Sequence, residues 1–118
     1  LISKLTKLKS LEIKCKHLKS LPKEIGNLVK LEKLKMYCEK LKKLPKEIGN
    51  LTNLKKLEID CKKLKEIPHE IKNLINLEYI HITWNGKTEE LPKEILSFKK
   101  LNNVYICNRL RENKARRK

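Results

Sequence analysis

The chain repeats itself about every 23 residues, and this period constrains its fold more than any other feature. A leucine or isoleucine followed by proline marks each unit, at Leu21-Pro22, Leu44-Pro45, Ile67-Pro68 and Leu91-Pro92. The first three pairs are 23 residues apart, and the fourth follows after 24. Such a period indicates a solenoid, in which each repeat buries its apolar face only against its neighbours. The sequence therefore predicts one continuous array and not a compact domain with a single central core.

Each repeat predicts a short β-strand followed by a helical turn. Apolar and polar residues alternate in the predicted strands, as around Leu57 and Ile59, which is the pattern of a strand with one buried face. The sequence Pro-Lys-Glu-Ile then predicts a helical turn, because proline suits the first helical position and glutamate is favourable near a helix N-terminus. Gly26 and Gly49 follow, and we expect them to let the chain leave the helix.

The motif LxxLxIx, followed by LxxLPxEIGNL, resembles the leucine-rich repeats over residues 2–110. It is similar to the 23-residue type of bacterial repeat proteins and, more loosely, to the repeats of plant disease-resistance receptors. The resemblance implies an α/β solenoid with a concave parallel β-sheet and short helical turns on the convex side. Residues 1–110 then form about five repeats, which we expect to be an excerpt of a longer array. Residues 111–118 are predicted to be a basic C-terminal cap or tail.

Three cysteines, Cys15, Cys38 and Cys61, recur with the repeat. The resemblance implies an asparagine at the next position, inside the array, but charged residues stand there in three repeats. Because buried charges are costly, we expect the cysteines to turn inward and serve as small apolar side chains. A linear column of single cysteines does not offer the tetrahedral geometry of a zinc site, so no metal or cofactor is expected. The absence of a paired-cysteine framework favours a reducing, cytoplasmic location.

The formal net charge is +16, from 30 Lys and Arg against 14 Asp and Glu. A charge of this size favours attraction to anionic partners. The sequence contains no glycine-rich phosphate loop, metalloprotease motif or nucleophile elbow, so we expect no enzymatic activity and no catalytic residues. No apolar run reaches the length of a transmembrane helix.

The polar positions of the predicted strands line the concave side of the array. All three tyrosines of the chain fall at these positions, and tyrosine is favoured at binding hot spots, although strands also favour it without any binding role. Trp84 replaces cysteine in the fourth repeat, and the sequence leaves open whether it fills the core or stands on this surface. The candidate partner-binding residues are Tyr37, Tyr79, His81, Trp84, Tyr105, Lys14, Lys33, Lys35 and Lys56.

These features favour a non-enzymatic protein–protein interaction module that binds an acidic partner on its concave face, with the lysines steering the encounter. One alternative is an anion-binding surface for nucleic acid or acidic membrane, although the scarcity of arginine argues against specific nucleic-acid recognition. Another is a purely structural segment of a larger receptor. The N-terminal repeat has no polar cap, so its apolar edge is expected to meet more chain, another subunit or a partner.

Overall fold

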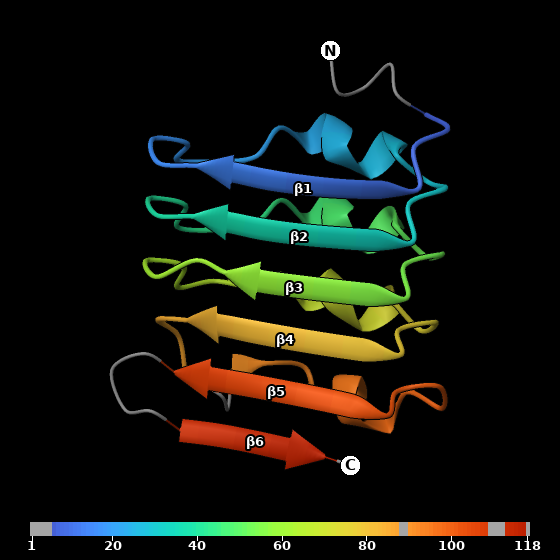
Figure 1. Ribbon diagram of the computed structural model, residues 1–118. Helices are drawn as coiled ribbons and strands as arrows, with labels where there is room; N and C mark the ends of the chain where they lie inside the picture. Colours follow the sequence, from blue (N-terminus) through green and yellow to red (C-terminus); the bar gives the residue numbers. More distant parts are fainter. Residues whose placement is uncertain (1–5, 88–89, 109–112, 118) are drawn as a thin grey trace.

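The computed structural model describes residues 6–87, 90–108 and 113–117. Five parallel strands lie side by side in chain order in one sheet. A sixth strand pairs antiparallel with the fifth and forms the edge of the sheet (Figure 1). The strands are β1 (Ser10–Cys15), β2 (Lys33–Cys38), β3 (Lys56–Asp60), β4 (Tyr79–Trp84), β5 (Asn103–Asn108) and β6 (Asn113–Arg117). The predicted solenoid with a parallel sheet is therefore confirmed.

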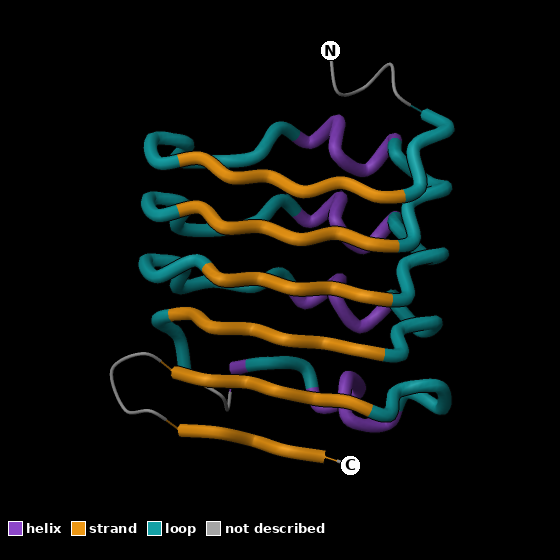
Figure 2. Tube along the Cα trace, in the orientation of Figure 1, coloured by secondary structure: helices purple, strands orange, loops and turns teal. Residues whose placement is uncertain are grey.

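Short 3-10 helices form the second layer, behind the sheet in Figure 2. They are η2 (Lys23–Asn27), η3 (Lys46–Asn50), η4 (His69–Asn73) and η6 (Lys93–Ser97). Proline immediately precedes each one in an extended conformation, with φ −70° at Pro22. The sequence predicted proline as the first helical residue, so that prediction was wrong by one position. The proline carbonyl nevertheless begins the turn, since Ile25 N donates to Pro22 O at 3.1 Å. This position needs no N–H from the proline, which explains why the pair recurs.

The apolar core lies between the sheet and the 3-10 helices. Neighbouring strands pair so that equivalent repeat positions face each other, as Leu34 does Leu57 and Met36 does Ile59. These four side chains are completely buried. A buried aliphatic side chain contributes about 1.5–3 kcal/mol, and here its cover comes from the repeats above and below.

The cysteines continue this inner row, as predicted. Cys38 and Cys61 are completely buried, and Cys15, on the first described strand, is partly buried beside Cys38. All three thiols are free. Burial raises the pKa of Cys61 to about 12, because a desolvated thiolate is disfavoured. Cys38 and Cys61 therefore behave as small apolar side chains with protonated thiols.

The glycines of the 3-10 helices have a different role from the one the sequence predicted. Gly26 and Gly49 lie inside η2 and η3, and neither has the left-handed φ of a helix-terminating glycine. A Cβ atom added to Gly49 would lie 2.6 Å from the carbonyl oxygen of Glu70 in the next repeat. Glycine therefore allows the backbones of adjacent 3-10 helices to approach each other closely. Lys72 occupies the equivalent place in η4, and there the next helix, η6, makes little contact.

The first described repeat is less covered than those that follow. Leu11 and Ile13 of β1 are partly exposed, whereas the equivalent Leu34 and Met36 of β2 are buried. Ile2 and Leu5, which the sequence assigns to the same repeat, lie outside the described residues. An oligomer formed through this edge thus stays a prediction. Across the described parts of the chain, every helix is too short or too polar to cross a bilayer.

Candidate interaction surface

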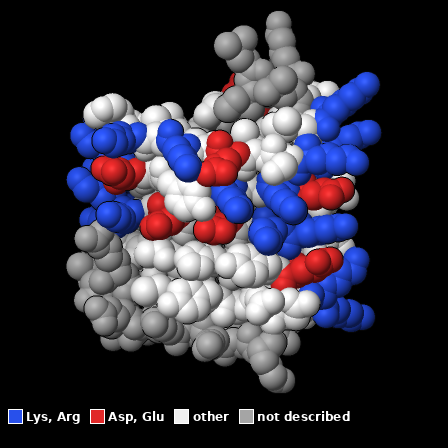
Figure 3. Space-filling view, viewed as in Figure 1, with Lys and Arg blue, Asp and Glu red and all other residues white. Residues whose placement is uncertain are grey.

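The solvent-facing side of the sheet carries the alternate strand residues that do not enter the core (Figure 3). Charged side chains gather over β1–β3, whereas the described solvent-facing residues of β4 and β5 include no Lys, Arg, Asp or Glu. The face is thus divided into two parts of different chemistry. We call the rings of Tyr79, His81 and Tyr105, on the uncharged part, the aromatic patch.

Side chains on the charged part of the face pair with one another. Lys14 Nζ lies 3.3 Å from Glu12 Oε2 and 5.9 Å from the centre of the Tyr37 ring. The Tyr37 hydroxyl donates a hydrogen bond to Glu58 Oε2 at 2.9 Å. This hydrogen bond, together with partial desolvation, raises the pKa of Tyr37 to about 12. These groups therefore already have partners within the chain.

The aromatic patch is assembled by the register of three strands. His81 on β4 lies opposite Tyr105 on β5, and their rings stack with centroids 4.9 Å apart and an interplanar angle of 27°. Thr83 Oγ1 lies 3.3 Å from His81 Nε2 and helps to hold the imidazole. Lys56 Nζ from β3 lies 5.2 Å from the centre of the Tyr79 ring, within cation–π range. The patch therefore presents three half-buried rings and one adjoining cation.

Trp84 does not belong to this surface, so its inclusion among the candidate binding residues was wrong. It is 1% exposed and continues the buried column of Cys38 and Cys61. The cause is strict alternation along β4, which turns the sixth residue of that strand toward the core. The other candidates face solvent as predicted. They are Tyr37, Tyr79, His81, Tyr105, Lys14, Lys33, Lys35 and Lys56.

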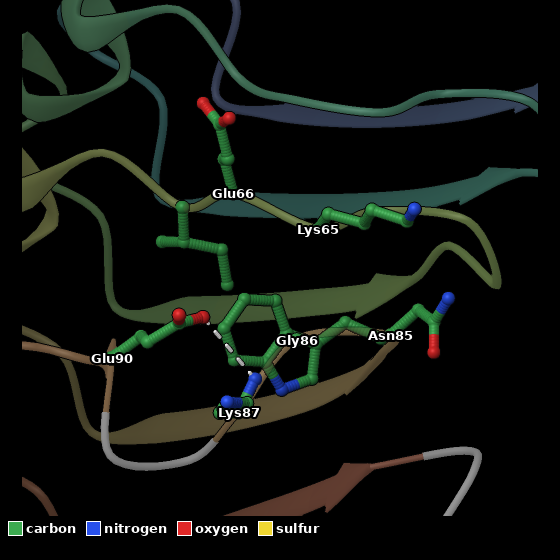
Figure 4. A pocket seen from close by; sticks show the side chains of 8 residues that line it. Lys65, Glu66, Asn85, Gly86, Lys87 and Glu90 are labelled. Atoms are coloured by element: carbon green, nitrogen blue, oxygen red, sulfur yellow. Dashed lines mark hydrogen bonds between the residues drawn. The ribbon is translucent and has the colours of Figure 1, made fainter.

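A cavity of about 500 Å³, which was not predicted from the sequence, lies beyond the C-terminal ends of the strands. It lies between residues 65–67 and residues 84–87, with Glu90 at its side (Figure 4). The extra residue of the fourth repeat and its Asn85-Gly86 turn were the signals for it. Trp84 Nε1 and Asn85 Oδ1 are buried here without a hydrogen-bond partner in the described structure. Unpaired buried polar side-chain atoms are costly, and among the described residues they occur only here.

No three His, Cys, Asp or Glu side chains within the described ranges are grouped as metal ligands would be. His17, His69 and His81 stand at unrelated positions of the repeat.

Comparison with known proteins agrees with this architecture. A family model described as a leucine-rich repeat region matches residues 1–117. Among solved structures, a leucine-rich repeat protein of Leptospira interrogans is similar, with 28% sequence identity and a TM-score of 0.68. The match covers 90% of this chain and 34% of that protein, so the chain spans about a third of its length. A search of curated proteins finds no match. The fold and the family match together show that the chain belongs to the leucine-rich repeat family.

Proposed function

We propose that the chain is a non-enzymatic protein-interaction module that holds an acidic protein partner on its concave face. The family supports an interaction role in general, because solenoids of this kind provide extended concave binding surfaces. In this proposal the aromatic patch anchors the partner. Four lysines on the same face, Lys14, Lys33, Lys35 and Lys56, attract it.

The observation that carries the proposal is the contrast between the two parts of the concave face. Over β1–β3, the Lys14–Glu12 and Tyr37–Glu58 contacts satisfy charged groups internally. Over β4–β5, stacked and half-buried rings offer a large area with little side-chain entropy to lose on binding. Aromatic rings of this kind are the usual anchors of protein interfaces. An anchor is therefore expected on the aromatic patch.

The charge of the chain supports an acidic partner. The net charge of +16 raises the rate of encounter with an anionic protein, and this acceleration weakens as salt screens it. Lys56 stands beside Tyr79, so one positive charge adjoins the anchor directly. A cytoplasmic location is part of the proposal, and the free thiols of the cysteine column support it.

The test is the affinity of a double variant, Tyr79→Ala with Tyr105→Ala, for an acidic partner isolated with the unaltered chain. Loss of two anchors is expected to weaken binding by several hundred-fold, because each hot-spot side chain contributes about 2 kcal/mol and every ~1.4 kcal/mol is a factor of ten. The matched control is Tyr37→Ala, which removes a tyrosine from the charged part of the same face. Circular dichroism melting confirms folding of each variant. Equal affinities for the double variant and the unaltered chain would refute the anchor.

A further inference from the structure

A second surface lies outside the concave face, on the loops that follow the C-terminal ends of β1, β2 and β3. Three loops, residues 16–20, 39–43 and 62–66, together contain eight lysines and two glutamates. All ten of these side chains are exposed. Lysine occupies the same repeat position in all three loops, at Lys19, Lys42 and Lys65. We call these three residues the lysine ladder.

The backbone holds the lysine ladder in register. Lys65 N donates to Lys42 O at 2.9 Å, and Lys43 forms parallel bridges with both Ser20 and Glu66. Neighbouring backbone segments paired in this way are about 4.8 Å apart, so lysine side chains of like charge extend from adjacent positions. Such pairs repel. No described carboxylate lies within ion-pair distance of the ladder lysines, so an anionic ligand would relieve the repulsion.

The cavity described above begins where the lysine ladder ends. Lys65 belongs to the ladder and also lines the cavity, with Glu66 and the aliphatic Ile67 (Figure 4). The Ser20–Lys43–Glu66 bridging does not continue to any described residue of the fourth repeat. In the fourth repeat Asn85 N still donates to Leu64 O of the third repeat at 2.7 Å, and the Asn85-Gly86 turn lies at this point. The opposite wall is formed by residues 84–87. The cavity thus lies where the longer fourth repeat meets the third.

We propose that this surface is a second binding site, for an acidic peptide segment of a protein. Carboxylates of the segment lie along the lysine ladder, and one apolar side chain of the segment enters the cavity beside Ile67. A volume of about 500 Å³ is ample for a large side chain. The site is separate from the aromatic patch, and it stands whether or not the concave face binds a partner.

Two observations favour a peptide over a nucleic acid at this surface. The ladder loops contain lysine and no arginine, and lysine lacks the planar fork that reads phosphates and bases in pairs of hydrogen bonds. The indole of Trp84 is not open for base stacking, because it is 1% exposed. Gly86 also packs on its ring so closely that an added Cβ would lie 2.2 Å from the ring atom Cζ3. Single-stranded nucleic acids depend on such stacking platforms.

The experiment uses Trp84, the sole tryptophan of the chain, as a reporter of the cavity. The intact chain is titrated with a short acetylated polyglutamate peptide that has one central leucine, and tryptophan emission is recorded. The same peptide with serine in place of leucine, and an oligothymidylate of matched charge, are titrated in parallel. The leucine peptide is expected to change the emission and to bind more tightly than either comparison ligand. Equal binding of the serine peptide, or tighter binding of the oligonucleotide, would overturn the proposal.

Variants then locate the site. Replacing all three ladder lysines by alanine is expected to weaken the leucine peptide about tenfold, from three exposed ion pairs. The matched control removes the same charge from the 3-10 helices of the convex side, as Lys23→Ala, Lys46→Ala and Lys93→Ala. The control should bind as the unaltered chain does, after correction for net charge by a salt titration. Equal losses in the two triple variants would show that total charge alone is responsible.

Discussion

The close packing of the 3-10 helices makes Gly49→Ala the most direct test of how the repeats stack. The new Cβ would lie 2.6 Å from the carbonyl oxygen of Glu70 and 2.8 Å from its Cβ, where ordinary contacts begin near 3.4 Å. Both of these atoms belong to or adjoin the backbone of η4. No flexible side chain can therefore move aside, and η3 and η4 must separate by several tenths of an ångström.

The expected cost follows from two opposing terms. Overpacking of this kind typically costs about 1–3 kcal/mol. Alanine also restricts the unfolded chain relative to glycine, which returns about 0.4–1 kcal/mol when the native backbone angles suit it, as they do here. The net loss in the free energy of unfolding is therefore about 0.5–2 kcal/mol. For a domain of this size the melting temperature falls by several degrees.

Urea denaturation followed by far-ultraviolet circular dichroism measures this loss. Lys72→Ala is the matched control, because it places the same side chain at the equivalent position of η4, where the neighbouring η6 is not closely packed. Its effect should stay within about 0.5 kcal/mol. If Gly49→Ala were as stable as the unaltered chain, steric exclusion would not explain the glycine.

Three further predictions concern the core and the sheet. Leu57→Ala should cost about 2–5 kcal/mol, and Leu11→Ala, at the same position of a partly exposed strand, about 1 kcal/mol; equal losses by urea denaturation would contradict a core covered by flanking repeats. Because burial raises the pKa of Cys61 from 9.0 to about 12, its contribution to stability is complete below pH 9 and lost as the pH rises toward 12; melting temperatures should fall across this window, and less so in Cys61→Ala. Tyr37→Phe removes the 2.9 Å hydrogen bond to Glu58 and should cost about 0.5–1.5 kcal/mol at neutral pH, measured by urea denaturation; an unchanged midpoint would show that this bond adds no net stability.

The strands and the inner row were predictable because two periods act together. Alternation assigns Leu57 and Ile59 to one face, and the 23-residue repeat assigns their neighbours to the same positions. The same logic predicted that Cys38 and Cys61 turn inward. Trp84 stayed open because the extra residue beside it left the end of the strand uncertain, although the alternation along β4 does extend to it.

Other features depend on how neighbouring repeats meet, which no single repeat encodes. The tight contact at Gly49 involves Glu70 from the next unit and is visible only in three dimensions. The division of the concave face also depends on lateral register, which stacks His81 on Tyr105. The cavity arises between loops of unequal length, and their relative paths do not follow from either sequence alone.

The longer fourth repeat has a consequence for how such arrays diversify. Tyr79 still pairs with Asn103, and Ile80 with Val104, although the repeat that separates them has gained a residue. The extra residue lies after β4, so it does not change which residues of β4 and β5 pair with each other. Length variation can therefore accumulate along this margin and create new recesses there, while the pairing that builds the ribbon is inherited unchanged.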